Sequence, residues 1–198
     1  ALALMDALAL DRPLLMGHSM GGRNTLMAAL SAPERMRALV VVDIGPEVSD
    51  KGRRSIASFV AANEEFEDLD AFIANVRRYD PYRSLEHIER TVRYNLFQRA
   101  DGKYVSKCDR LPRKLGLTQQ FSADELSLEH MAALAMPVLV VRGANSTILE
   151  ESAAERFTQA LPDGALKIVP ACGHNVHSQN TLGFLDAIDG FLSQHVNC

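Results

Sequence analysis

The sequence has little cysteine, and its cysteines are not arranged in pairs. Only Cys108, Cys172 and Cys198 occur in 198 residues, an odd number at wide spacing. A small secreted domain held together by disulfides would carry more cysteines, so we expect free thiols and a reducing, cytoplasmic compartment. The absence of a C-x-x-C pair also argues against a structural zinc site.

The chain also lacks a basic excess and a long apolar run. It has 21 basic and 25 acidic side chains, a net charge of −4 and a pI of about 5.9. A general nucleic-acid binder would show a basic face, and a membrane-spanning helix would need roughly 20 apolar residues in a row. With 47% apolar residues, the composition instead predicts a globular domain with a substantial core, no nucleic-acid partner and no membrane span.

Four short apolar segments predict buried strands: Pro13–Met16, Ala38–Asp43, Pro137–Arg142 and Ala165–Val169. The first three are apolar without strict alternation, which is typical of strands covered on both faces of a parallel sheet. The fourth alternates more and is expected nearer an edge. Apolar side chains at helical spacing follow the strands, in sets such as Leu26, Met27 and Leu30; Ala154, Phe157 and Leu161; and Phe184, Ile188 and Leu192. The alternation of strand and helix predicts an α/β fold with a doubly wound parallel sheet.

A long insertion separates the second predicted strand from the third. It contains helical stripes, Leu69, Phe72, Ile73 and Val76 in one and Leu85, Ile88, Val92 and Leu96 in the other. A connection of this length is far beyond an ordinary loop. We therefore expect residues 1–45 and 137–198 to form the α/β core, and residues 46–136 to form an inserted helical lid over one end of the sheet.

The first residues, ALALMDALAL, predict a helix already under way, because Leu4, Met5 and Leu8 fall at helical spacing. No initiator methionine precedes them, and the basic region of a signal peptide is missing. We therefore expect the sequence to begin inside a domain.

A G-x-S-x-G motif lies between the first predicted strand and the helix after it. It reads Gly17-His18-Ser19-Met20-Gly21, followed by Gly22. A strand that turns sharply into a helix holds its serine in a strained conformation and brings backbone segments close together, so the flanking positions must be small. Gly17 and Gly21 are expected to meet that demand. The same turn exposes the Ser19 hydroxyl and directs the first backbone N–H of the helix, that of Met20, toward a developing oxyanion.

This motif, the inserted helices and a late Gly-His together resemble the α/β-hydrolase fold superfamily, over essentially the whole chain. The resemblance implies a serine nucleophile at Ser19 and a histidine base directly after the last strand. His174 in Cys172-Gly173-His174 matches that position, with His177 as the rival. His18 is interpreted as a packing or hydrogen-bonding residue.

The residue that serves as the acid partner of the histidine base is harder to identify from the sequence. Most members of the superfamily carry it after the penultimate strand, where this chain has Arg142-Gly143-Ala144-Asn145-Ser146 and no carboxylate before Glu150 and Glu151. Asp43 ends the second strand at the same edge of the sheet as Ser19. The chain thereby resembles a bacterial esterase subgroup that places its acid after that strand. Asp43 is the predicted acid, and Glu150 or Glu151 is the alternative.

These residues imply cleavage of a carboxylic ester or thioester through an acyl-enzyme on Ser19, with no metal and no organic cofactor. A serine at the elbow argues against the dehalogenases and epoxide hydrolases of the superfamily, which use an aspartate there. Two alternatives stay open: hydrolysis of carbon–carbon bonds in ring-cleavage products, and a non-catalytic binding protein. In the first, Arg77, Arg78 and Arg83 would bind a carboxylate; otherwise they are a solvated helix face.

The resemblance also implies a second oxyanion N–H and further strands upstream of Ser19. Neither has room in the 18 residues before it. We expect the edge of the Pro13–Met16 strand to stand open, and open strand edges favour self-association.

Overall fold

The computed structural model describes residues 1–62, 65–107 and 126–196. The chain divides into two compact units. The core unit comprises residues 1–52 and 123–198, and the insert unit comprises residues 53–122. Each is described by itself below.

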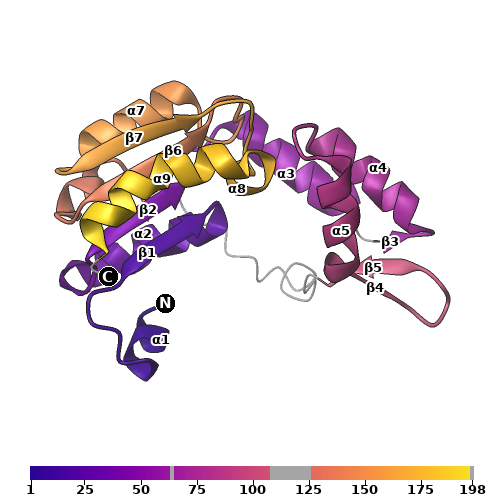
Figure 1. Cartoon of the computed structure of the whole chain (residues 1–198), viewed down its shortest axis with the longest axis horizontal. Coiled ribbons are helices and arrows are strands. Elements are labelled where there is room, and N and C mark those ends of the chain that lie inside the picture. Colours follow the sequence, from indigo (N-terminus) through magenta and orange to yellow (C-terminus); the bar gives the residue numbers. More distant parts are fainter. Residues whose placement is uncertain (63–64, 108–125, 197–198) are drawn as a thin grey trace. The chain divides into compact units, whose positions relative to one another are not determined.

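The core unit is built on a four-stranded parallel sheet in the order β1-β2-β6-β7 (Figure 1). Its strands are β1 (Leu14–His18), β2 (Ala38–Val42), β6 (Val138–Gly143) and β7 (Gly164–Val169). All four predicted strands are present, with ends shifted by one or two residues. In the part of the chain that the structure describes, β1 and β7 are the two ends of this order, as the alternation in β7 indicated.

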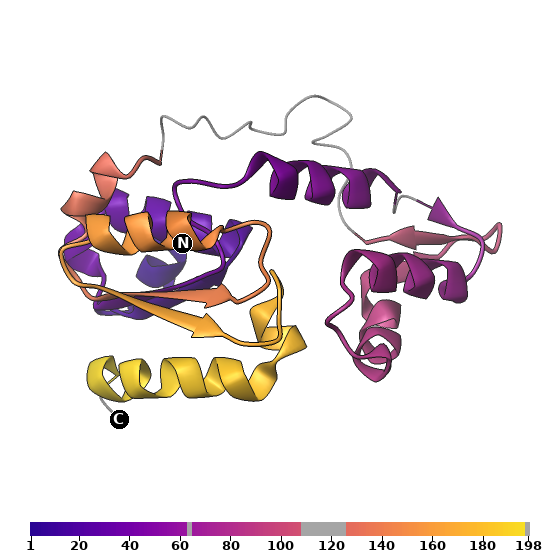
Figure 2. The same cartoon turned by 90° about the horizontal axis from the view of Figure 1, so that it is seen from above.

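Helices cover both faces of the sheet. They are α2 (Met20–Ser31), α7 (Glu151–Ala160), α8 (Val176–Gln179) and α9 (Thr181–His195). Helix α1 (Leu2–Ala7) precedes β1, and α3 (Asp50–Ala62) runs from the core unit into the insert unit. Figure 2 shows α9 against one face and α2 and α7 against the other. Short 3-10 turns occupy Pro33–Arg35 and Glu129–Ala133. This arrangement confirms the doubly wound α/β fold.

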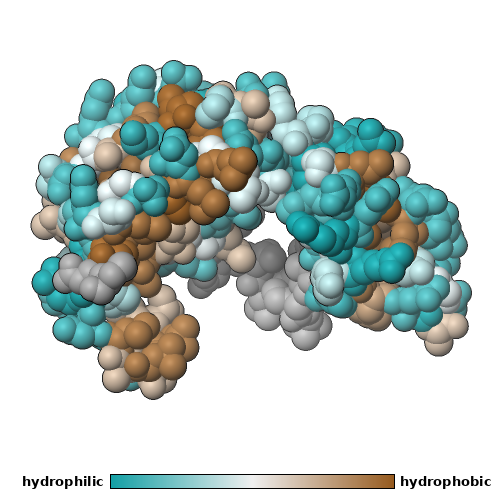
Figure 3. Space-filling view, in the orientation of Figure 1, coloured by the Kyte–Doolittle hydropathy of each residue, from teal (hydrophilic) through white to brown (hydrophobic). Residues whose placement is uncertain are grey.

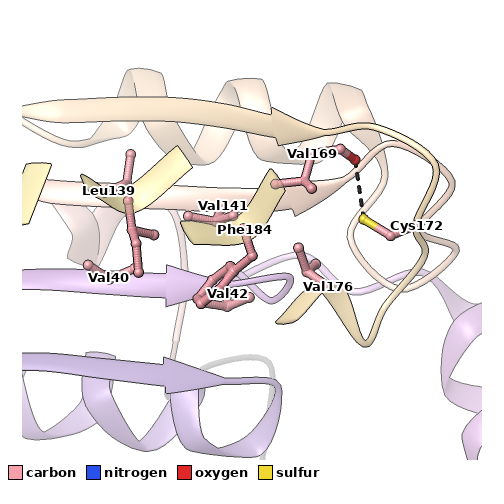
Figure 4. Close-up of a cluster of buried hydrophobic side chains, with 9 residues drawn as sticks. Val40, Val42, Leu139, Val141, Val169, Cys172, Val176 and Phe184 are labelled. Atoms are coloured by element: carbon pink, nitrogen blue, oxygen red, sulfur yellow. Dashed lines mark hydrogen bonds between the residues drawn. The ribbon is translucent and has the colours of Figure 1, made fainter. Parts of the chain in front are cut away.

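The core explains why the strands are apolar without alternation. On one face, side chains of β2, β6 and β7 pack with α8 and α9 in a cluster of Val40, Val42, Leu139, Val141, Val169, Cys172, Val176, Phe184 and Ile188 (Figure 4). The alternating residues of β2 and β6 point to the opposite face and are also buried; they are Leu39, Val41, Val138 and Val140. Both faces of β2 and β6 are therefore removed from water.

Cys172 belongs to this cluster and is a free thiol. Its Sγ lies 3.3 Å from the carbonyl oxygen of Val169. Burial raises the pKa of the Cys172 thiol above its ordinary value. The other two cysteines, Cys108 and Cys198, lie outside the described residues.

Helix α1 and the residue after it leave part of their apolar surface exposed. Met5 is buried, but Leu4 and Leu8 are exposed. Figure 3 shows the resulting apolar surface over α1. The periodicity in this segment thus predicted the helix but not which of its side chains are covered.

In its described residues, 53–62 and 65–107, the insert unit contains a small antiparallel sheet and two helices besides the end of α3. The helices are α4 (Leu69–Tyr79) and α5 (Leu85–Asn95), and the sheet has the order β3-β5-β4, with β3 (Glu65–Phe66), β5 (Tyr104–Ser106) and β4 (Leu96–Gln98). Both predicted apolar stripes are used in its core, which comprises Phe66, Phe72, Val76, Ile88, Val92 and Leu96. The sheet was not predicted, because strands of two or three residues are too short to show a period.

Side chains cap the N-terminal ends of α4 and α5. Asp68 accepts a hydrogen bond from the backbone N–H of Ala71 at 2.7 Å, and Ser84 accepts one from His87 at 3.2 Å. Such caps satisfy backbone donors that the first helical turn leaves without partners. Across residues 1–62, 65–107 and 126–196, the chain has no helix both long and apolar enough to cross a bilayer.

The passage from β1 into α2 depends on two glycines. A Cβ at Gly17 would lie 2.3 Å from the carbonyl oxygen of Gly21, and a Cβ at Gly22 would lie 2.8 Å from that of Gly17 and 2.6 Å from Cγ2 of Ile44. A Cβ at Gly21 would meet no heavy atom within 4 Å. The G-x-S-x-G pattern predicts that Gly17 and Gly21 must be small. The structure corrects this to Gly17 and Gly22, because Gly21 contributes backbone to the contact and its own Cβ position is open.

Gly22→Ala is therefore expected to destabilise the fold by about 1–3 kcal/mol, since the added methyl must displace backbone atoms and Ile44. Gly21→Ala is the matched control, which adds the same methyl one residue earlier in the same helix turn. It is expected to be neutral or to stabilise by up to about 1 kcal/mol, because alanine favours the helix. Guanidinium unfolding of the two variants and the parent measures both effects. Equal midpoints for the two variants would contradict the assignment of the close contact to Gly22.

Candidate active site

The carboxyl ends of the parallel strands meet at one edge of the core-unit sheet. In register, His18 lies beside Val42, Val42 beside Val141, and Gly143 beside Val169. The ladder continues just past the strands: the N–H of Ser19 donates to Val42 at 3.0 Å, and that of Asp43 donates to Val141 at 2.8 Å. Ser19 and Asp43 are thus held by the sheet although neither belongs to a strand.

Ser19 occupies the turn between β1 and α2 in a strained conformation. Its φ is 53° and its ψ is −118°, a region that non-glycine residues rarely adopt. The hydroxyl Oγ lies 2.9 Å from Nε2 of His174. The motif therefore places a serine hydroxyl within hydrogen-bond distance of an imidazole.

His174 bridges Ser19 and Asp43. It lies in the connection between β7 and α8, and its Nδ1 is 2.8 Å from Oδ2 of Asp43. A carboxylate accepts hydrogen bonds, so Nδ1 carries the proton and Nε2 is left to accept the Ser19 hydroxyl. The rival, His177, lies instead against the rings of His18 and Phe184, with ring centroids 5.0 and 6.2 Å away.

Asp43 is wholly buried and engaged on both carboxylate oxygens. Its side chain is 0% exposed. Oδ1 accepts the backbone N–H of Gly143 at 3.0 Å, while Oδ2 accepts the hydroxyl of Ser146 and faces Nδ1 of His174. A buried carboxylate needs such donors, because an unpaired charge in a low-dielectric site costs several kcal/mol.

Glu150 and Glu151, the alternative acids, are both exposed and lie at the start of α7. Glu150 is the residue that precedes the helix, and Glu151 is 3.6 Å from the guanidinium of Arg142. The structure brings Asp43, rather than either glutamate, to His174.

Ser146 and Gly143 are site residues that sequence patterns did not indicate. Gly143 is the last residue of β6, and Ser146 lies in the loop that follows. Arg142 shapes that loop: its side chain is buried and donates to the backbone carbonyls of Leu149 and Ala144, at 2.9 and 3.2 Å. The available signal was a short polar residue at the place where most superfamily members carry the acid. A serine there can donate to an acid that comes from the neighbouring strand.

The loop between β7 and α8, residues 170–175, carries His174 and is called the base loop here. Its backbone closely approaches the end of β6. A Cβ at Gly143 would lie 2.1 Å from the carbonyl oxygen of Gly173. The N–H of Asn145 also donates to the carbonyl of Cys172 at 2.8 Å. The loops after β6 and β7 therefore form one packed layer behind Asp43.

Met20, the predicted oxyanion donor, is the first residue of α2. Backbone N–H groups in the first turn of a helix have no partner within the helix and carry partial positive charge. The position can therefore stabilise negative charge beside Ser19. Within the described ranges, no group of three histidine, cysteine or acidic side chains could hold a metal ion.

The arrangement can transfer a proton from a serine hydroxyl to an imidazole that is held by a buried carboxylate. That chain of hydrogen bonds runs Asp43–His174–Ser19 and draws on β2, β7 and β1. It is the geometry by which hydrolases activate a serine for attack on a carbonyl carbon.

The chain is similar to known hydrolases over nearly its whole length. The chain is 28% identical to the sn-1-specific diacylglycerol lipase ABHD11 of Mus musculus over 96% of this chain and 62% of that protein. It is 26% identical to the esterase YbfF of Escherichia coli, over 96% of this chain and 70% of that protein.

Among solved structures, the crystal structure of E-2-(acetamidomethylene)succinate hydrolase matches with a TM-score of 0.81 at 25% identity. The match covers 97% of this chain and 70% of that one. The chain thus spans between three fifths and three quarters of the length of these relatives. The family model for the alpha/beta hydrolase fold matches residues 1–181. The chain belongs to the α/β-hydrolase fold family.

Proposed function

We propose that the protein is a serine hydrolase that cleaves carboxylic esters or thioesters through an acyl-enzyme on Ser19. The observation that carries the proposal is the continuous chain of hydrogen bonds from Asp43 through His174 to the Ser19 hydroxyl, with 2.8 and 2.9 Å at the two imidazole nitrogens. A serine without an adjacent base is a poor nucleophile at neutral pH, and this chain supplies the base.

In the first half of the reaction, Ser19 Oγ attacks the carbonyl carbon while its proton passes to Nε2 of His174. The resulting imidazolium is stabilised by the Asp43 carboxylate and then donates that proton to the leaving alcohol or thiol. In the second half, His174 takes a proton from water, and the hydroxide formed attacks the acyl carbon. Collapse of this intermediate releases the carboxylic acid and returns the proton to Ser19.

In both halves, negative charge develops on the carbonyl oxygen. The backbone N–H of Met20 is the proposed donor to that oxygen from this chain, because it lies at the start of α2 directly after Ser19. The proposal needs no metal or organic cofactor, because every proton transfer in it uses Ser19, His174 or water.

Ester cleavage is preferred over carbon–carbon bond cleavage for one structural reason. A carboxylate-binding role was considered for Arg83, but its guanidinium lies 2.8 Å from Asp80, which is 2% exposed. That charge is already paired inside the insert unit. The relatives named a diacylglycerol lipase and an esterase favour the same choice. A purely non-catalytic role would leave the strained Ser19 and its three-residue chain of hydrogen bonds without a purpose.

Treatment with a fluorophosphonate is expected to modify Ser19 and no other residue, because such reagents capture a serine that a base has activated. Intact-mass measurement and peptide mapping detect the adduct, and Ser19→Ala is the control that should take up none. Absence of labelling in the parent chain would overturn the proposal for this chain.

Asp43→Asn is expected to lower kcat by about 10³–10⁴-fold, because an amide neither stabilises the imidazolium nor enforces the tautomer with the proton on Nδ1. Glu150→Gln is the matched control, with the same change of group in an exposed side chain, and should alter kcat by less than about twofold. Steady-state hydrolysis of a p-nitrophenyl ester measures both. The reverse ranking would return the acid to the loop after β6.

Ser146→Ala is expected to lower kcat by about 10- to 100-fold with KM nearly unchanged, because it removes one hydrogen bond to the buried carboxylate. Ser31→Ala deletes an exposed hydroxyl at the end of α2 and should leave kcat unchanged. The same ester assay applies. If Ser146→Ala retains full kcat, this hydroxyl does not support the acid.

A further inference from the structure

His18, the last residue of β1, contacts the loop that carries His174. Its Nε2 lies 2.8 Å from the backbone carbonyl oxygen of His174. The two rings lie side by side, with centroids 4.6 Å apart and planes at 43°. The residue directly before the nucleophile therefore contacts the residue that activates it, across 156 positions of sequence.

The chemistry of this contact fixes its direction. A backbone carbonyl can only accept a hydrogen bond, so Nε2 of His18 carries a proton and donates it. Both the neutral form with its proton on Nε2 and the charged form of His18 have that N–H.

Other contacts fix the base loop before His174 but leave its carbonyl to His18. The N–H of Gly173 donates to the side chain of Gln179 at 2.5 Å, and the carbonyl of Cys172 accepts from Asn145 at 2.8 Å. The imidazole of His174 is held at Nδ1 by Asp43. This single hydrogen bond leaves the ring free to rotate about Nδ1. The position of Nε2 therefore also depends on where the backbone of His174 lies.

The bond from His18 sets the position of that backbone relative to Ser19. His18 and Ser19 are consecutive residues, and the strand register beside Val42 holds both. Since the carbonyl of His174 is attached to the same strand end as the Ser19 hydroxyl, thermal displacement of the base loop moves the base and the nucleophile together. A misplacement of about 1 Å between reacting groups can cost roughly 100-fold in rate.

We propose that His18 is a positioning residue that holds His174 at the distance needed to activate Ser19. The proposal rests on the proposed function of Ser19 and His174 and adds a role for a residue that sequence interpretation assigned to packing or hydrogen bonding. What matters is the Nε2–H donor, rather than the bulk of the ring.

The test compares His18→Gln with His18→Leu. The amide nitrogen of glutamine can reach the place of Nε2 and donate, whereas leucine fills similar space without a donor. The rate constant for fluorophosphonate labelling of Ser19 is expected to fall by about 10- to 100-fold in His18→Leu. It should stay within about fivefold of the parent in His18→Gln. With a p-nitrophenyl ester, the loss should fall on kcat, with KM changing by less than about threefold.

Thermal unfolding separates positioning from folding. The two variants are expected to melt within a few degrees of each other, so their difference in rate does not reflect lost structure. If His18→Leu does not fold, His18→Asn takes its place, because its amide nitrogen stops near the place of Nδ1 and cannot reach the carbonyl.

Parent-like labelling in His18→Leu would overturn the proposal, as would equal losses in the glutamine and leucine variants. Failure of the proposed function looks different, because the parent itself would then not be labelled. In that event, hydrogen exchange of the backbone around Gly173–Val176 tests whether His18 holds the base loop in place. Faster exchange in His18→Leu than in His18→Gln would support this role, and equal exchange would refute it.

Discussion

The wholly buried carboxylate of Asp43 requires three donors, and those donors determine how the strand ends are joined. The N–H of Gly143 comes from the end of β6, the hydroxyl of Ser146 from the loop after it, and Nδ1–H of His174 from the loop after β7. Because leaving such a charge unpaired costs several kcal/mol, these contacts stabilise the docking of both loops at the edge of the sheet. The group that stabilises the proposed catalytic imidazole thus also organises the edge of the sheet.

Backbone strain is also present at this edge. Ser19, Asp43 and Ala171, which lies in the same loop as His174, have φ values of 53°, 52° and 53°. Each such residue costs on the order of 1–3 kcal/mol and persists only where its surroundings determine its conformation. Here the sheet does so, through the ladder bonds of Ser19 to Val42 and of Asp43 to Val141.

Much of this arrangement follows from sequence, for identifiable reasons. The strands were predictable because both faces of β2 and β6 are buried, which makes them continuously apolar. Ser19 was predictable because the strand-to-helix turn has the recognisable G-x-S-x-G pattern, and His174 because a late Gly-His matches the position of the base in the family. Asp43 was predictable because parallel strands end at the same edge of the sheet.

What could not be predicted depends on contacts between residues distant in sequence. Ser146 and Asp43 are 103 positions apart, and a serine at the usual place of the acid does not itself show which carboxylate it contacts. The steric demand at Gly22 arises from Ile44 and Gly17, which no local rule relates to it. The small sheet of the insert unit pairs segments too short to show a period.

The placement of the acid on β2 has a consequence for the order in which the site can be assembled during synthesis. Strands β1 and β2 and the helix between them form one local βαβ segment, so serine and carboxylate can come together soon after the ribosome has made it. The imidazole comes 131 positions after Asp43, beyond the whole insert unit. Until the chain beyond the insert unit has been made, His174 is absent, so the proposed activation of Ser19 has to wait for β6, β7 and the loop that follows them.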